Sequence, residues 1–392
     1  MKNKYEELLA AMPNNSKIIY EDYFDLFPTL VELSKTPQDY LYHAEGDVWT
    51  HTKMVCNELL NLPEYQNSND EDKFILFYSA LLHDISKPAC TKINENNRIS
   101  SAGHSKMGAI DTRVLLWERD VPFFIRESIC NIVEVHQLPF YAFHFNPNKK
   151  QRDPLLLGNI LSANNNMPLL FTLAKADMLG RICPTLQDNL DNMELFKELC
   201  LENNIFYDKK NFPDDFTRVK YFRSEGAISP DYPFFYEKGS DVIVMSGLPA
   251  TGKDYWISRN YPNLPVIGFD LSEKELGLKH GENNGLVFHH VQDKAKDFLR
   301  NKESFVFNAT HIVKDLRDKT LDLLYNYNAQ VNIVYLEESK QTIFERNNKR
   351  DTSLSNDNIS KMLNRWDIPK AIESHSISYN INQHNNHLRK KR

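Results

Sequence analysis

The stretch VIVMSGLPATGKD, residues 242–254, carries the clearest structural signal in the sequence. It opens with a short apolar run typical of a buried strand, passes through a glycine-containing loop, and ends where a helical pattern begins. The loop GLPATGKD matches the pattern G-x-x-x-x-G-K, in which backbone N–H groups surround phosphate oxygens. The sequence therefore predicts a strand, a phosphate-binding loop (P-loop) and a helix, in that order.

This loop is expected to hold ATP or another NTP together with Mg²⁺. Lys253 would neutralise the β- and γ-phosphates, whereas Asp254 replaces the Ser or Thr that usually ligates Mg²⁺. Two interpretations follow: the carboxylate holds Mg²⁺ directly or through water, or the loop binds a nucleotide without catalysing a reaction. The expected nucleotide contacts are Gly247, Leu248, Pro249, Ala250, Thr251, Gly252, Lys253 and Asp254.

Short apolar runs alternate with helical patterns from this motif outward. Such alternation predicts a parallel α/β sheet, and residues 240–392 are assigned to this domain. The expected strands cover residues 241–247, 264–270, 305–311 and 330–337.

Asp270 is expected at the carboxyl end of the second strand, where open α/β sheets bind ligands. There it would act as the general base for an acceptor hydroxyl. The alternative is structural, because Asp270-Leu-Ser-Glu273 has the pattern of a capping box. Farther along, Arg346 and Arg350 are four residues apart, so they share one helix face that would close over ATP as a lid. A solvated surface helix is the alternative for that segment.

Before the sheet, apolar residues recur at helical spacing, and residues 1–207 are predicted to form an all-α bundle. The adjacent pair His83-Asp84 lies between His51 and Asp177, in the order H…HD…D. Neutral imidazoles and carboxylates together hold divalent metals, and a bridging carboxylate can hold two. This order of residues predicts a metal site that activates water.

Further side chains would extend that site. His104 and His136 would complete a second metal position, although a single helical histidine is more often packed or on the surface. Lys87 follows the His-Asp pair by about one helical turn, and Arg181 lies four residues after Asp177, so both would offer positive charge to a phosphate.

Bulk properties narrow the class of protein. The length of 392 residues suits two domains, and residues 208–239, rich in Pro, Phe and Tyr, are interpreted as an ordered connector. The net charge of −6 argues against a broadly basic nucleic-acid coat but allows a local channel for one strand end. Because no stretch is apolar enough for a membrane span or signal peptide and the five cysteines form no CxxC pair, we expect a cytoplasmic protein without a membrane partner.

The motifs HAEGDVWTHTKMV, LLHDISKPACT, GHSKMGA and AKADMLGR resemble successive motifs of HD-superfamily phosphohydrolases over residues 43–181. They are especially similar to the HD domains attached to bacterial CCA-adding enzymes. The resemblance implies metal-dependent phosphohydrolysis with two divalent transition-metal ions, and contact between His43 and the scissile phosphate. The metal ligands that it implies are His51, His83, Asp84, His104, His136 and Asp177.

The second half resembles the phage-type polynucleotide 5′-kinases through the P-loop, Asp270, the run FVFNATH with a following Arg317, and RNNKR. This resemblance implies that Lys253 and Arg350 contact phosphates, that Arg346 belongs to the lid, and that Asp270 activates a polynucleotide 5′-OH.

One position departs from that family. An arginine that contacts the acceptor's phosphate usually follows the base closely, but residues 271–276 read LSEKEL. Lys274 is the nearest substitute, which leaves the details of acceptor binding open.

Together, the halves resemble the bacterial HD-domain polynucleotide kinases, which are two-site RNA end-healing enzymes. This resemblance implies that the first half removes a 2′,3′-cyclic, 2′- or 3′-phosphate and that the second half phosphorylates a 5′-OH with an NTP. The implied partners are RNA ends, with DNA ends left open, and an RNA ligase. Two alternatives remain: an HD nucleotidase fused to a nucleoside or nucleotide kinase, and an RNA-end-binding module with a non-catalytic P-loop.

Overall fold

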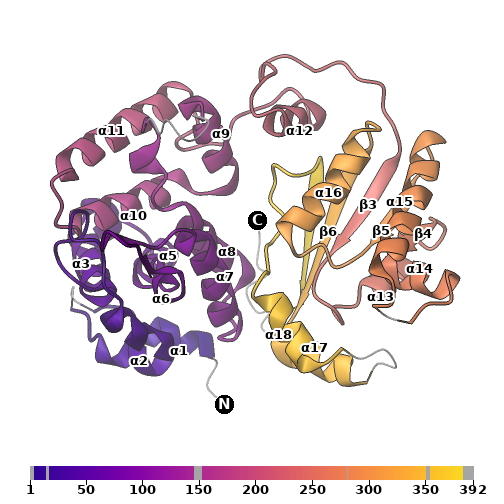
Figure 1. The fold of residues 1–392 in the computed structure, drawn as a ribbon. Helices are drawn as coiled ribbons and strands as arrows, with labels where there is room; N and C mark the ends of the chain where they lie inside the picture. Colours follow the sequence, from indigo (N-terminus) through magenta and orange to yellow (C-terminus); the bar gives the residue numbers. More distant parts are fainter. Residues whose placement is uncertain (1–3, 15–16, 145–151, 280, 350–353, 383–392) are drawn as a thin grey trace. The chain divides into compact units, whose positions relative to one another are not determined.

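The computed structural model describes residues 4–14, 17–144, 152–279, 281–349 and 354–382 (Figure 1). Contacts within the chain divide it into two compact units, Met1–Lys210 and Asn211–Arg392, and each is described by itself. As predicted, the first is helical and the second contains a parallel sheet with helices. Within the described residues, no helix is both long and apolar enough to cross a membrane.

The helical unit is a bundle in which α3, α8 and α10 pack around α5. Its α-helices are α1 (Lys4–Ala10), α2 (Glu21–Leu26), α3 (Val48–Asn61), α4 (Pro63–Gln66), α5 (Asp70–Leu82), α6 (Lys87–Cys90), α7 (His104–Trp117), α8 (Phe123–Val135), α9 (Pro154–Asn164), α10 (Met167–Leu179) and α11 (Leu186–Glu202). Two 3-10 helices, η1 (Pro28–Lys35) and η2 (Pro139–Tyr141), join them.

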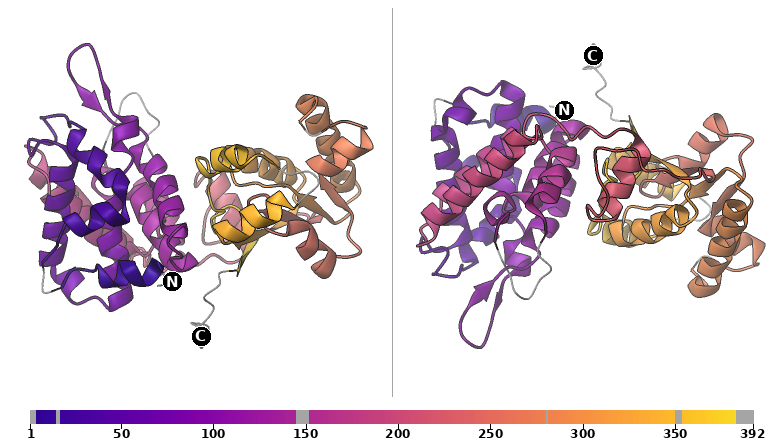
Figure 2. Two further views of the ribbon diagram at one scale, coloured as in Figure 1. Left: turned by 90° about the horizontal axis from the view of Figure 1, so that it is seen from below. Right: turned by 90° about the horizontal axis from the view of Figure 1, so that it is seen from above.

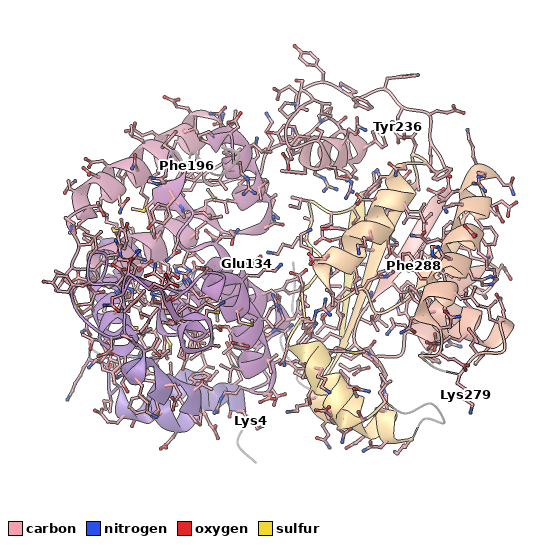
Figure 3. All side chains as sticks on the ribbon, in the orientation of Figure 1. Lys4, Glu134, Phe196, Tyr236, Lys279 and Phe288 are labelled. Carbon is pink, nitrogen blue, oxygen red and sulfur yellow. The ribbon has the colours of Figure 1, made fainter. Side chains whose placement is uncertain are left out.

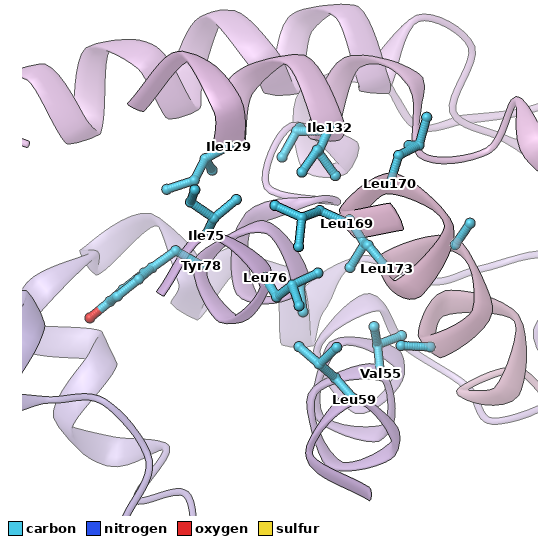
Figure 4. Packing of buried hydrophobic residues seen from close by; sticks show 14 of the residues in the cluster. Val55, Leu59, Ile75, Leu76, Tyr78, Ile129, Ile132, Leu169, Leu170 and Leu173 are labelled. Atoms are coloured by element: carbon cyan, nitrogen blue, oxygen red, sulfur yellow. The ribbon is translucent and has the colours of Figure 1, made fainter. Parts of the chain in front are cut away.

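Helix α5 forms the centre of this bundle. All its residues from Phe74 to Leu82 are buried, which explains why the stretch has no polar face. Figure 4 shows Ile75 and Leu76 of α5 among side chains of α3, α8 and α10. The helix begins at Asn69, whose side chain accepts a hydrogen bond from the backbone N–H of Asp72. This buried helix ends at the His83-Asp84 pair and so carries it into the interior.

A small hairpin interrupts the helical unit. Strand β1 (Lys92–Ile93) pairs with β2 (Ile99–Ser100), and the hairpin projects from the bundle in Figure 2. These two short strands are a local exception in a unit that is otherwise helical, as predicted. Asn94 accepts hydrogen bonds from the backbone N–H groups of Asn96 and Arg98, and this local turn competes with a helix.

The second unit is built on a five-stranded parallel sheet with the strand order β4-β5-β3-β6-β7. The strands are β3 (Asp241–Ser246), β4 (Val266–Gly268), β5 (Phe305–Asn308), β6 (Gln330–Glu338) and β7 (Ser376–Asn382). The helices are α12 (Asp215–Arg223), α13 (Lys253–Asn260), α14 (Phe269–Glu275), α15 (Asn284–Arg300), α16 (Lys314–Tyr325), α17 (Lys340–Asn348) and α18 (Asn356–Leu363).

Helices cover both faces of this sheet (Figure 2). Val291 of α15 and Leu321 of α16 pack on one face, and Ile257 of α13 packs on the other. Strand β3 lies between β5 and β6, so the chain leaves it where the strand order reverses. Loops diverge at such a point and open a crevice at the carboxyl ends of the strands. The P-loop follows β3 and therefore lies at this crevice.

The observed strands differ from the expected ones in two ways. Strands β4 and β5 end at Gly268 and Asn308, earlier than predicted, and β7 is an additional edge strand that pairs with β6. The run SISYNIN of β7 alternates polar and apolar residues. This alternation is typical of a strand, but the sequence analysis did not predict one here.

The segment predicted as a connector contains α12 and packs within the second unit. Arg218 donates hydrogen bonds to the backbone carbonyls of Ser374 and His375. The ring of Phe216 stacks on Tyr236, which is labelled in Figure 3, with ring centroids 3.4 Å apart. These contacts explain why aromatic residues are frequent in this segment.

Candidate active sites

The predicted metal ligands meet inside the helical unit. His51 comes from α3, His83 and Asp84 follow α5, His104 begins α7, His136 follows α8, and Asp177 lies in α10. Each of these residues is buried. Residues more than 120 positions apart in sequence, such as His51 and Asp177, thereby become neighbours, with His51 Nε2 3.1 Å from Asp177 Oδ1.

The imidazole Nε2 atoms and the carboxylates converge on one region. His83 Nε2 lies 3.4 Å from His51 Nε2 and 3.2 Å from Asp84 Oδ2. His104 Nε2 lies 3.3 Å from Asp84 Oδ1. Three sets of residues have ligand atoms within 4.8 Å of one another, and each shares a member with another: His43, Glu45 and His51; His51, His83 and Asp177; and His83, Asp84 and His136. His104 belongs to none of these sets, and its Nε2 atom also lies 3.2 Å from the hydroxyl of Ser105.

Backbone carbonyls fix the orientation of these imidazoles. The Nδ1 atoms of His83, His104 and His136 each contact a carbonyl three residues earlier in the chain, at 2.7 to 2.8 Å. His51 Nδ1 contacts the carbonyl of Gly180 at 3.1 Å. A carbonyl can only accept, so each Nδ1 atom carries a proton and each Nε2 atom faces the site, where a bound metal ion would take its lone pair.

The result is a buried group of acceptors that fits a cation. In neutral rings, the Nε2 lone pairs of His51 and His83 face each other beside two carboxylates. Asp84 Oδ1 and His136 Nε2 are buried without a hydrogen-bond partner among the described residues. Burial lowers the pKa of His136 to about 3, which keeps this ring in the neutral form that binds metals. A divalent ion, or two adjoining ions, would satisfy these atoms.

Two cations border the carboxylates of this group. Lys87 Nζ lies 2.7 Å from Asp84 Oδ2 and donates to Gln38 Oε1. Arg181 donates to both carboxylate oxygens of Asp177, at 3.0 and 2.6 Å. Burial by itself would raise the pKa of both carboxyls. His83 and Lys87 nevertheless hold the pKa of Asp84 well below its usual range, and Arg181 does the same for the pKa of Asp177. Both acids are therefore ionised near neutral pH, which is the form that can bind a metal ion.

Sequence reasoning missed Glu45, which connects two histidines at the edge of the site. Its Oε1 atom lies 2.7 Å from His43 Nδ1 and 3.0 Å from His51 Nδ1. Its Oε2 atom accepts a hydrogen bond from the backbone N–H of Ile182. Burial lowers the pKa of His43 to about 4, despite the opposing effect of Glu45. Glu45 has no characteristic spacing to His51 in the motif HAEGDVWTH, so the sequence alone offered no signal for its role.

The P-loop has the backbone shape that its glycines allow. Gly247 and Gly252 adopt positive φ angles of 145° and 89°, and Ala250 has φ 64°. A Cβ atom at Gly247 would lie 2.4 Å from the carbonyl oxygen of Leu336, so only glycine fits there. Lys253 Nζ donates to the carbonyls of Gly247 and Leu248, at 3.0 and 2.9 Å. Lys253 thus lies over the loop, where nucleotide phosphates would bind.

The rest of the predicted P-loop contacts are arranged around this loop. Pro249 and Ala250 form its turn, and the buried Thr251 hydroxyl donates to the carbonyl of Leu248. Asp254 is exposed in the first turn of α13 and accepts a 2.6 Å hydrogen bond from the side-chain amide of Asn308. The P-loop thus leaves one carboxylate accessible next to the expected phosphate position.

Asp270 is accessible at the same edge of the sheet but not at a strand end. Strand β4 ends at Gly268, and Asp270 lies in the first turn of α14. The capping box considered for this helix does not form, because the helix cap is Gly268 and the Glu273 carboxylate accepts from the backbone N–H of Gly281 instead. Lys274, the expected substitute for the family's arginine, is exposed on α14.

Of the two residues expected in the lid, Arg346 and Arg350, the structure describes the first. Arg346 of α17 forms an ion pair with Glu338 at 2.9 Å, and its Nη1 atom lies 3.5 Å from the carbonyl of Ala250 in the P-loop. Arg350 lies outside the described residues.

Arg317, part of the resemblance to 5′-kinases, is fully buried and bound to Glu373 and Asp367, so it holds the fold together rather than facing a substrate.

The second unit is a P-loop kinase-type domain by its sheet order and loop geometry. In agreement, residues 242–369 match the family model of an AAA domain. The chain is also 30% identical over 118 residues to the multifunctional CCA protein of Pasteurella multocida (strain Pm70) and 30% identical over 122 residues to that of Mannheimia succiniciproducens. These stretches cover 30% and 31% of this chain, but only 27% and 28% of those proteins. The predicted similarity to bacterial CCA proteins is confirmed to this extent.

Proposed function

We propose that this protein is a two-site nucleic-acid end-healing enzyme. The helical unit would act as an HD phosphohydrolase that removes a 2′,3′-cyclic, 2′- or 3′-phosphate from an RNA end. The P-loop unit would transfer a phosphate from an NTP to a 5′-OH end. The observation that carries the first activity is the buried group formed by the Nε2 atoms of His51, His83 and His136, beside two ionised carboxylates.

In the helical unit, the side chains fit a phosphate ester. Bound divalent metal ions would supply Lewis-acid stabilisation of phosphate charge and a hydrolytic nucleophile near neutral pH. Lys87 and Arg181 orient the carboxylates of Asp84 and Asp177. An ammonium has three N–H donors, and among the described residues Lys87 uses two, so one remains for a phosphate oxygen. His43, held by Glu45, lies at the rim of this group for contact with the ester.

In the second unit, positioning and charge would account for catalysis. Lys253 would exchange its two carbonyl contacts for the β- and γ-phosphates of the NTP, while Asp254 would hold Mg²⁺. The exposed carboxylate of Asp270 would accept the proton of the 5′-OH. Arg346, beside Ala250, would stabilise charge on the transferred phosphate.

The pairing of the two activities supports RNA ends as the substrate. Ligation needs a 3′-OH and a 5′-phosphate, whereas cleavage by many ribonucleases leaves the reverse, and neither activity alone heals such a break. An RNA ligase in the cytoplasm is the proposed functional partner, in keeping with five free cysteines.

The test uses the purified full chain and an RNA oligonucleotide with a 5′-OH and a 2′,3′-cyclic phosphate. Phosphate release from the 3′ end is followed with Mn²⁺, Ni²⁺, Co²⁺ or Zn²⁺, and 5′ transfer is followed with [γ-³²P]ATP and Mg²⁺. His83→Ala should abolish phosphate release and keep 5′ transfer. Lys253→Ala should do the opposite, because the two sites lie in separate units.

Other outcomes would select an alternative. Transfer to free nucleosides but not to oligonucleotides would indicate a nucleotidase joined to a nucleoside kinase. ATP binding with no transfer to any acceptor would indicate an end-binding module. If either single variant lost both activities equally, the assignment of one activity to each unit would be wrong.

A further inference from the structure

A buried glutamate lies at the carboxyl end of β6, the strand that pairs with the P-loop strand β3. Glu338 is the last residue of β6 and is only 5% exposed. Because β3 and β6 are parallel, this residue and the P-loop follow the same edge of the sheet. A carboxylate buried this deeply is costly unless hydrogen-bond donors or a cation hold it. No step of the proposed phosphate transfer uses this carboxylate directly.

Two side chains from different elements donate to the same oxygen of this carboxylate. Arg346 of α17 donates from Nη1 to Glu338 Oε1 at 2.9 Å, and Asn382 donates from Nδ2 to that atom at 3.0 Å. Asn382 is the last residue of β7 and the register partner of Glu338 in the pair of strands β6 and β7. The sheet therefore holds the carboxylate from one side, and the carboxylate in turn holds Arg346.

The guanidinium of Arg346 lies against the backbone of the P-loop. Its Nη1 atom is 3.5 Å from the carbonyl oxygen of Ala250, and a Cβ atom at Gly252 would lie 3.6 Å from it. The backbone N–H groups of such a loop surround the phosphate oxygens of a nucleotide. The ion pair with Glu338 therefore keeps a positive charge beside the expected phosphate position.

The remaining donors of Arg346 are available to a phosphate. Both contacts of its guanidinium use Nη1, and Nε and Nη2 have no hydrogen-bond partner within the part of the chain that the structure describes. The side chain is 48% exposed, so without Glu338 it could adopt many rotamers that point into solvent. A group that stabilises a transition state acts best when its neighbours fix its position beforehand.

We propose that Glu338 is a positioning residue that holds Arg346 against the P-loop for the phosphate being transferred, an inference that rests on the proposed kinase function. Glu338 contacts neither the nucleotide nor the acceptor. It binds the guanidinium through Nη1 and leaves Nε and Nη2 to the phosphate oxygens. Asn382 holds the carboxylate in place, which gives the edge strand β7 a part in the site.

The experiment measures kcat and the KM for ATP of the full chain with a 5′-OH RNA oligonucleotide. Arg346→Ala should lower kcat about 100-fold, because a donor to the transferred phosphate is lost. Glu338→Ala should lower kcat about tenfold, because the guanidinium remains but is no longer held in place. The KM for ATP should change little in both variants, since the interaction matters mainly in the transition state.

A double variant separates positioning from a general structural effect. Adding Glu338→Ala to Arg346→Ala should lower kcat no further, because the carboxylate acts through the guanidinium. Asn382→Ala, at an exposed residue that the fold tolerates more easily, should show a smaller loss of kcat with the same dependence on Arg346. Asp297→Ala is the matched control, because it removes an exposed ion pair with Arg300 in the same unit and should leave kcat unchanged.

Three results would overturn the proposal. The first is an equal loss of kcat from Glu338→Ala in the presence and in the absence of Arg346, because the carboxylate would then act independently. The second is a higher kcat in Glu338→Ala, which would mean that the ion pair withholds the arginine from ATP. The third is an unchanged kcat in Arg346→Ala. A wild-type chain that transfers no phosphate to the oligonucleotide would instead overturn the proposed kinase function itself.

Discussion

The side-chain amide of Asn308 donates a 2.6 Å hydrogen bond to the carboxylate of Asp254. Asn308 is the last residue of β5, and Asp254 lies in the first turn of the helix after the P-loop. The bond therefore joins the neighbouring strand to the residue that replaces the usual Ser or Thr of the loop. It holds the carboxylate in one place at the crevice, as a metal ligand requires, which favours a role of Asp254 in binding Mg²⁺.

Asn308→Ala should weaken Mg²⁺ binding without removing the ligand itself. We expect the Mg²⁺ concentration for half-maximal 5′ transfer to rise about tenfold, as is typical when the partner of a ligand is lost. Asp254→Ala should raise it further, because the carboxylate is then absent. The measurement is a Mg²⁺ titration of transfer from ATP to a 5′-OH oligonucleotide.

Asn260→Ala serves as the control for this titration, because Asn260 is an exposed asparagine at the other end of the same helix. Unchanged Mg²⁺ dependence in Asp254→Ala would show that the carboxylate is no ligand. A wild-type chain that binds Mg²⁺ and ATP without transfer would favour the non-catalytic interpretation of the loop.

Glu45→Gln should reduce the metal affinity of the helical unit about tenfold. Glu45 accepts from the imidazoles of both His43 and His51, and a neutral amide cannot hold both rings in the same orientation. The measurement is calorimetric titration of the metal-free protein with Mn²⁺, which does not depend on catalysis. Glu64→Gln, at a partly exposed pair with Lys175, should leave the affinity unchanged. If Glu45→Gln lost phosphatase activity at full metal affinity, Glu45 would act on the substrate and not through its histidines.

The parts of the molecule that the sequence predicts well are those with a strong local pattern. The run before Gly247 is apolar and the loop needs glycine, so a strand, a loop and a helix were predictable together. The order of the predicted metal ligands was also readable, because His83 and Asp84 follow a mostly apolar stretch, residues 74–82, that must be buried. The distances between these predicted ligands could not be read from the sequence, because they depend on how the helices pack against one another.

Other features depend on contacts that no local pattern encodes. The capping box at Asp270 does not form because the helix starts one residue before it, at Phe269, with Gly268 as its cap. Glu273 then bonds to Gly281, beyond the helix. Glu45 has no characteristic spacing to His51, so its role became visible only when the loop carrying it folded against α3. Arg317 follows a family motif but lies in the interior.

Arg317→Met should destabilise the second unit by about 3–5 kcal/mol. The buried guanidinium donates to the carboxylates of Glu373 and Asp367, and without it these two acids remain near each other in the interior. Urea unfolding of the full chain should show an earlier transition for the second unit only. Arg300→Met, which removes an exposed ion pair with Asp297, should change stability little. Unaltered stability of Arg317→Met together with lost 5′ transfer would contradict the structural role.

His375 should make the second unit less stable in mild acid. Burial, and then the charge of Arg218, lower the pKa of His375 to about 4, and the acids Asp214 and Asp215 only partly oppose this. Its Nδ1 atom accepts a hydrogen bond from the backbone N–H of Val331 in β6, which a protonated ring cannot do. The unfolded chain, with a histidine pKa of about 6.5, therefore binds more protons between pH 6.5 and 4.

The contribution of His375 to the free energy of unfolding is therefore fully present above the unfolded pKa of about 6.5, and it decreases as the pH falls toward about 4. Hydrogen–deuterium exchange of β6, corrected for the intrinsic rate, should show weaker protection at pH 5 than at pH 7. His311, whose pKa burial also lowers to about 4, adds to the loss, so His375→Phe should reduce the effect without removing it. Phenylalanine keeps a flat ring next to Phe216 and Tyr325 and cannot be protonated. Equal pH dependence in His375→Phe and the wild-type chain would assign the acid sensitivity to other groups.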